Sequence, residues 1–256
     1  MQRMLIVLLT LTLLGCASNP PQQSVSSKPK VNNVQAAEYN TQLGIGYLHQ
    51  NNYERAKEKL LLALKQNPAS PQANSAMAYF LEKTADYQNA ETYYKKAISL
   101  AKDSGPMQNN YGAFLCRRGQ YLEANQQFVQ AAQDPKYLNP ANAYENAGLC
   151  AMLIPDHDAA INYFKEALQK NPKMGTSIFQ LAELYYQQQN YPQSYQYVQQ
   201  YLKEKQPNAE VLWLAIRLAY QRGDYNSAAS YGILLQSKFS ETKQYQEYLK
   251  LKATKG

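Results

Sequence analysis

The sequence predicts an all-α protein, a right-handed superhelical solenoid of six helix pairs followed by a C-terminal capping helix. One helix–turn–helix pattern recurs about every 34 residues along the chain. Small residues recur at fixed positions of this pattern, where two helices must approach closely. A turn-forming residue followed by Tyr separates the helices of several units, as in Asn52–Tyr53 and Asp86–Tyr87. These three features together indicate stacked helix pairs.

The stretch 109–124, NNYGAFLCRRGQYLEA, shows one unit clearly. Gly112 is the small residue of its first helix, and Ala124 is the small residue of its second helix. Residues 118–120 form the expected turn between these helices, because glycine adopts the backbone angles that a tight turn requires. The remaining elements are predicted by aligning the chain to this unit.

The repeated pattern resembles the tetratricopeptide repeat, which sets a Leu–Gly pair, then Tyr, Ala, an aromatic residue and Pro. The first unit follows it closely, with Leu43, Gly44, Tyr47, Ala56 and Pro68. We expect six repeats, at 37–70, 71–104, 105–138, 141–174, 175–208 and 209–242. The sixth is the most eroded, and 243–256 is expected to form the capping helix and tail.

The N-terminus carries the features of an export signal. Residues 4–14 are almost wholly apolar and follow the positively charged Arg3. This run is too short to span a bilayer but suits a signal peptide, which we assign to 1–15. Leu13–Leu14–Gly15–Cys16 resembles the bacterial lipobox, in which the cysteine becomes acylated. The alternative is an ordinary secretory signal with a chance cysteine.

Residues 16–36 are expected to form an acylated cysteine and a flexible tether. Pro, Ser, Gln and Asn dominate this stretch, and apolar residues are too sparse to form a core. No Asp follows Cys16 directly, which resembles lipoproteins sorted to the outer membrane. The sequence therefore predicts a lipid-anchored protein on the periplasmic face of the outer membrane.

Charge and motifs disfavour nucleic-acid binding and catalysis. The net charge is +7, and no run of Lys or Arg is longer than two residues. His49 and His157 are the only histidines, and they stand in different repeats without a ligand cluster at metal spacing. No phosphate-binding loop or nucleophile motif occurs. We therefore expect no enzyme activity, cofactor, metal or small-molecule substrate.

Two cysteines, Cys116 and Cys150, remain besides Cys16. They lie in the first helices of consecutive repeats, Cys116 at position 12 of its repeat and Cys150 at position 10. A difference of two positions along a helix rotates one side chain by about 200° relative to the other. This placement lets the two side chains face each other between neighbouring helices, and an exported chain meets an oxidising compartment. A disulfide is favoured, and the alternative is two buried free thiols.

The first helices of such an array are expected to line a face that binds a partner. In the first four repeats this predicted groove includes Ile45, Leu48, Tyr79, Asn109 and Leu149. A second aromatic patch comprises Phe179, Tyr186, Trp213 and Tyr220, spaced at seven and 34 residues. The alternative for both sets is packing between neighbouring helices. The expected ligand is an extended or helical protein segment.

The stretch 109–124, together with AYENAGLCAM at 143–152, resembles the type IV pilus biogenesis lipoproteins, the pilotins of the pilus secretin. This resemblance implies a lipoprotein that binds secretin subunits and promotes their localisation and ring assembly in the outer membrane. It also implies that Cys116 and Cys150 pair, and that the early repeats carry the secretin-binding groove. The alternative function is a periplasmic scaffold lipoprotein for envelope enzymes or outer-membrane protein assembly.

Overall fold

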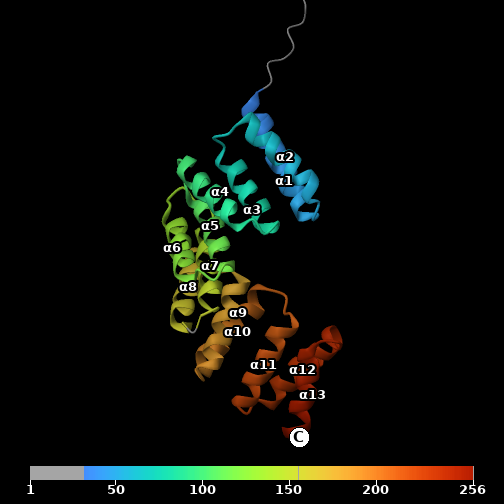
Figure 1. Cartoon of the computed structure of the whole chain (residues 1–256). Coiled ribbons are helices and arrows are strands. Elements are labelled where there is room, and N and C mark those ends of the chain that lie inside the picture. Colours follow the sequence, from blue (N-terminus) through green and yellow to red (C-terminus); the bar gives the residue numbers. More distant parts are fainter. Residues whose placement is uncertain (1–31, 155, 256) are drawn as a thin grey trace, which may run out of the picture. The chain divides into compact units, whose positions relative to one another are not determined.

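The computed structural model describes residues 32–154 and 156–255, which form thirteen α-helices and no strand (Figure 1). The helices are α1 (Asn33–His49), α2 (Tyr53–Gln66), α3 (Pro71–Lys83), α4 (Tyr87–Leu100), α5 (Gly105–Arg117), α6 (Tyr121–Gln133), α7 (Pro140–Ala151), α8 (His157–Lys170), α9 (Gly175–Gln187), α10 (Tyr191–Glu204), α11 (Ala209–Gln221), α12 (Tyr225–Phe239) and α13 (Lys243–Lys255). The predicted signal peptide at 1–15, Cys16 and most of the tether lie outside the described residues. Consecutive helices pack as pairs from α1·α2 to α11·α12, and each pair stacks on the next, which confirms the predicted all-α solenoid.

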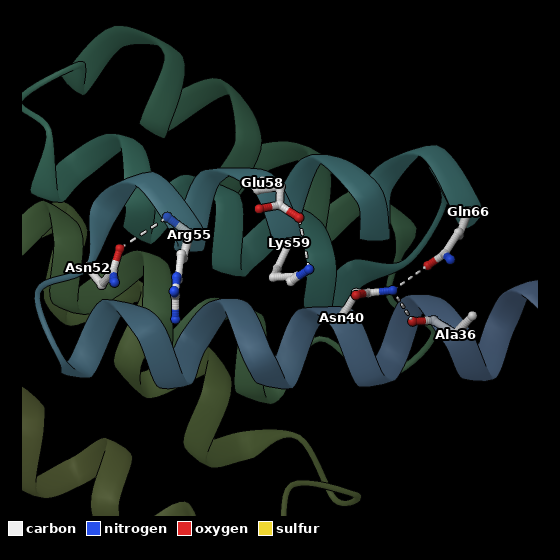
Figure 2. A network of polar contacts seen from close by, with 7 residues as sticks. All are labelled: Ala36, Asn40, Asn52, Arg55, Glu58, Lys59 and Gln66. Atoms are coloured by element: carbon white, nitrogen blue, oxygen red, sulfur yellow. Dashed lines mark hydrogen bonds and ion pairs between the residues drawn. The ribbon is translucent and has the colours of Figure 1, made fainter.

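The first helix is longer than the sequence predicted. α1 begins at Asn33, four residues before the expected start of the first repeat, so residues 33–36 are helical and do not belong to the tether. The side-chain amide of Asn40 donates hydrogen bonds to the Ala36 carbonyl oxygen and to Gln66 Oε1, both at 2.9 Å (Figure 2). Asn40 thus links the added turn of α1 to the end of α2.

The turns within the helix pairs follow one chemical rule. An Asn or Asp stands immediately before five of the six second helices, and its side chain accepts a hydrogen bond from a backbone N–H of the first turn. Figure 2 shows this contact at the start of α2, where Asn52 Oδ1 accepts from Arg55 N at 3.2 Å. Such a cap satisfies a donor that the helix itself leaves unpaired. Gln120, before α6, makes no side-chain cap.

Small residues allow the helices of a pair to touch. A Cβ atom added at Gly112 of α5 would lie 2.9 Å from the ring of Phe128 in α6. One added at Gly148 of α7 would lie 2.7 Å from the ring of Phe164 in α8, and Gly44 meets Leu60 in the same way. Real Cβ atoms do not approach other atoms this closely, so these positions require glycine for the observed packing.

The last helix covers the end of the sixth pair. Tyr248 of α13 is only 7% exposed and packs with Leu212, Ile216 and Leu235 of α11 and α12. A Cβ at Gly232 would lie 2.3 Å from the Tyr248 ring, so α13 and α12 are in close contact. Within the described part of the chain, no helix is both long enough and apolar enough to cross a bilayer.

Candidate partner-binding site

A cavity of about 360 Å³ opens between α1, α3 and α5, the first helices of repeats one to three. Its lining combines aliphatic, aromatic and polar side chains from these three helices, together with Tyr94 of α4. The residues that line it are Ile45, His49, Gln72, Ser75, Ala76, Tyr79, Tyr94, Met107, Asn110, Ala113 and Arg117. An apolar side chain of a partner can move from water into such a space.

One side of the cavity is fixed by a three-residue polar cluster. Arg117 of α5 donates to both carboxylate oxygens of Glu82 in α3, at 2.5 and 2.9 Å. The hydroxyl of Tyr94 donates to Glu82 Oε2 at 3.1 Å. The Glu82 side chain is only 9% exposed, whereas that of Arg117 is 50% exposed. The guanidinium group is therefore held in place by a buried carboxylate and still faces solvent.

The electrostatics of this cluster keep the Tyr94 hydroxyl protonated. Burial raises the pKa of Tyr94 far above its ordinary value, and the neighbouring Glu82 carboxylate raises it further. Tyr94 thus remains a hydrogen-bond donor at every physiological pH. Glu82 accepts from both Tyr94 and Arg117, so the cluster does not need a ligand to satisfy the buried carboxylate.

The remaining polar groups of the cavity can bind a peptide backbone. The side-chain amide of Asn110 donates to Ser75 Oγ at 3.1 Å, which links α5 to α3. Asn110 is exposed, and an amide carries acceptor lone pairs besides its donors. Lys83 Nζ lies 5.2 Å from the ring centroid of Tyr79 and adds a cation beside an apolar wall. The arrangement suits an apolar anchor flanked by backbone hydrogen bonds.

The predicted groove is only partly the observed cavity. Ile45 and Tyr79 line it, but Leu48 does not, because it is 4% exposed and packs with Ala56 and Leu60 in the core between α1 and α2. The assignment of Leu48 to the groove was therefore wrong. Its side chain belongs to a core cluster that draws residues from α1, α2 and α3.

Asn109 and Leu149 also lie outside the cavity lining. Asn109 Oδ1 accepts a hydrogen bond from Asn146 Nδ2 at 3.0 Å, which joins α5 to α7. Leu149 is 37% exposed on α7. The cavity uses the adjacent Asn110 instead, since one residue along a helix turns the side chain by about 100°. Sequence reasoning also missed Met107 and Arg117, which share the inner face of α5 with Asn110.

The second predicted patch forms a separate, smaller cavity of about 190 Å³. Tyr186, Trp213 and Tyr220 line it together with Arg217, Gln221 and Leu251. Phe179 does not line this cavity and packs instead against the core cluster that contains Leu214 and Val198.

Arg217 is the central residue of this second cavity. Its Cζ lies 4.4 Å from the ring centroid of Tyr186 and 5.5 Å from that of Trp213. Its Nη2 donates to Glu183 Oε1 at 2.5 Å. Stacking on two rings and pairing with a carboxylate fix the guanidinium between α9 and α11.

The first helices of repeats three and four are joined covalently. Cys116 of α5 and Cys150 of α7 form a disulfide, with the sulfur atoms 2.16 Å apart and the Cα atoms 5.9 Å apart. Cys116 directly precedes Arg117, so the disulfide also fixes the end of α5 that carries part of the cavity. Among the residues that the structure describes, no group of three or more His, Cys, Asp or Glu could hold a metal ion.

The fold and the inner-face cavities define a tetratricopeptide-repeat protein. Models of the tetratricopeptide repeat match residues 41–105, 115–174 and 156–215. The chain is 32% identical to the type IV pilus assembly protein PilF of Pseudomonas aeruginosa over 95% of its own length and 96% of that protein. An uncharacterized protein of Haemophilus influenzae is 36% identical over half of this chain and 70% of its own length.

Two solved structures agree with these relationships. The structure of Pseudomonas aeruginosa PilF matches with a TM-score of 0.72 and 32% identity, over 86% of this chain and 99% of that one. The structure of PilW, described as a widely conserved type IV pilus biogenesis factor, matches with a TM-score of 0.69 and 27% identity, over 84% and 99%. The chain belongs to the tetratricopeptide-repeat family of type IV pilus biogenesis proteins that PilF and PilW represent.

Proposed function

We propose that this protein is an outer-membrane lipoprotein that binds subunits of the type IV pilus secretin and promotes their localisation and ring assembly. Its relatives are named for pilus assembly and pilus biogenesis, and they align with most of the chain. The lipobox-like sequence at Cys16 supports an anchor on the periplasmic face of the outer membrane.

The observation that carries the proposal is the cavity between α1, α3 and α5. It is preformed, because Glu82, Tyr94 and Arg117 are fixed by hydrogen bonds without a ligand. It offers apolar walls at Ile45 and Tyr79 beside polar groups suited to a peptide backbone. A preformed surface with few anchors binds a protein segment without a large ordering cost. This chemistry fits capture of an unassembled polypeptide.

Replacing Ile45 with Lys tests the role of the cavity. Burial of an uncompensated ammonium group against the apolar walls should weaken secretin binding by about tenfold or more. Ile233→Lys is the matched control, because Ile233 is 68% exposed on α12 and far along the chain from the cavity. Both variants are expressed in a bacterium that assembles type IV pili and lacks its own copy of this protein.

The measurements are co-purification of the secretin with each variant and the number of secretin rings in the outer membrane. Circular dichroism with thermal unfolding establishes that both variants fold. We expect I45K to lose secretin and rings, and I233K to retain both. Normal secretin binding and ring number in folded I45K would contradict the proposal. Recovery of other envelope proteins in place of the secretin would favour the scaffold function.

A further inference from the structure

The two edges of the helix stack differ in charge. We call the stretches between repeats the loop edge: 65–70, 100–105, 133–140, 170–175, 203–209 and 238–243. The turns within the pairs form the turn edge: 49–55, 83–89, 117–123, 151–159, 187–193 and 221–227. The loop edge holds nine lysines and four acidic residues, whereas the turn edge holds five basic and six acidic residues. The loop edge therefore carries a net charge of +5, and the turn edge carries −1.

Side-chain contacts connect neighbouring repeats at two places along the loop edge. Lys136 Nζ pairs with Asp103 across two successive loops at 2.9 Å. Lys173 Nζ lies 3.5 Å from Glu204, which ends α10 at the next loop. Gln200 Nε2 donates to the Pro172 carbonyl oxygen at 3.1 Å. These contacts hold adjacent loops close together. The charges of such loops therefore add up toward any surface that faces the loop edge.

The strongest positive charge lies where the fourth, fifth and sixth repeats meet. Lys170, Lys173, Lys203 and Lys205 are all exposed there, and Glu204 is the only acidic residue within the two loop-edge stretches concerned. The Lys173 side chain is 73% exposed even though it pairs with Glu204. Exposed leucines occur on both edges, as at Leu138 and Leu122, so charge alone distinguishes the two.

The chain enters the helical body at this same edge. α1 begins at Asn33, and the first helix of every later repeat also begins at the loop edge. Under the proposed function, the lipid is attached 17 residues earlier, at Cys16. A 14-residue helix is about 21 Å long, so the turn edge lies about one helix length beyond the point where the chain enters the helical body. The proposed lipid is therefore joined to the helical body at the loop edge and not at the turn edge.

We propose that the loop edge, centred on Lys170, Lys173, Lys203 and Lys205, docks on the anionic phospholipid surface of the membrane that carries the anchor. Lysines near an anionic bilayer are attracted to it, and the attraction falls off within a Debye length. Docking by this edge leaves the turn edge pointing away from the bilayer. Because the helices run from the loop edge to the turn edge, docking holds their axes roughly along the membrane normal.

The proposal rests on the proposed lipid anchor, and the test uses the full-length mature chain reconstituted into vesicles. A fluorescent label is attached at Gln206→Cys on the loop edge or at Gln187→Cys on the turn edge, both exposed glutamines. Energy transfer to an acceptor lipid reports how near each label lies to the bilayer. Vesicles contain either phosphatidylcholine alone or phosphatidylcholine with phosphatidylglycerol. Every variant carries the same N-terminal segment, so differences report the helical body.

We expect phosphatidylglycerol to increase energy transfer from the label at 206 and not from the label at 187, and 0.5 M salt to remove the increase. Lys170→Glu/Lys205→Glu should lower the population of docked molecules by about tenfold. Arg55→Glu/Lys57→Glu makes the same change in net charge on α2 and should dock as the wild type does.

Three outcomes would overturn the proposal. They are equal responses of the two labels, docking of the Lys170→Glu/Lys205→Glu variant as strong as wild type, and equal loss in the Arg55→Glu/Lys57→Glu control. Binding of the loop edge to an acidic protein from the envelope but not to anionic vesicles would also overturn it. Cys16→Ser tests the anchor separately. If it abolishes membrane location while Lys170→Glu/Lys205→Glu and Arg55→Glu/Lys57→Glu dock equally well, the result supports the lipid anchor and contradicts the docking surface.

Discussion

Ala85 occupies a backbone conformation that its side chain disfavours. Its φ is 62°, in the left-handed region, directly before the cap residue Asp86. Gly119 and Gly223 occupy the same place in other turns, with φ of 78° and 71°. The turn sets this angle, because the N–H of the cap residue must reach back to a carbonyl of the first helix, as Asp86 N does to Leu81 O at 2.8 Å.

Replacing Ala85 with Gly should therefore stabilise the protein. Relief of the left-handed strain is worth about 1 kcal/mol, and the greater freedom of Gly in the unfolded chain offsets part of it. We expect an increase of about 0.5 kcal/mol in the free energy of unfolding. Gly119→Ala, at the same place in the next turn, should lower it by about 1 kcal/mol. Urea unfolding measures both, and a destabilised A85G would contradict the strain argument.

At the scale of the helix, position 12 of the repeat shows what the sequence could and could not predict. This position holds Leu48, Glu82, Tyr186 and Tyr220 in repeats one, two, five and six. Leu48 packs into the core, Glu82 is a buried carboxylate beside the first cavity, and the two tyrosines line the second. The position lies at the border between the inner face and the core, so side-chain size and the neighbouring repeat decide its role.

The helix pairs themselves were predictable because their signals are local. Asn52, Asp86 and the corresponding caps mark where second helices begin, and Gly112 and Gly148 mark where helices touch. The cavity was not predictable in the same way. Its polar cluster joins Glu82 to Arg117, 35 residues away, and such a pair depends on how two repeats stack.

The disulfide is the element-scale feature with the largest expected effect on stability. It links residues 34 apart in sequence, and closing such a loop in the unfolded chain is worth about 3–4 kcal/mol in the chain-entropy description. We expect reduction of the wild-type chain to lower the urea midpoint and to speed amide exchange in α5 and α7. Cys116→Ala/Cys150→Ala should start at the lower midpoint and show no response to reductant. Equal midpoints for oxidised and reduced wild type would contradict this account.

At the scale of the whole molecule, the proposed function requires two separable parts. The helical body offers the cavity between α1, α3 and α5, and among the described residues the buried hydrophobic side chains lie between Ala37 and Tyr248. Cys16 lies outside the described residues, and under the proposed function it determines only where the protein is located. A change at Cys16 should therefore alter location without altering the fold or the binding site.

Cys16→Ser tests this separation directly. Without the thiol no acyl chain can be attached, and the loss of about 0.8 kcal/mol for each methylene buried in the bilayer removes stable anchoring. We expect the variant to keep the helical circular dichroism spectrum and the thermal midpoint of the wild-type body. Membrane fractionation should show it absent from the outer membrane, and secretin rings there should fall in number. Ala17→Ser is the matched control, because it introduces the same residue beside Cys16 and leaves that cysteine in place. Secretin rings at wild-type number in the outer membrane of the Cys16→Ser strain would show that the anchor has no part in assembly.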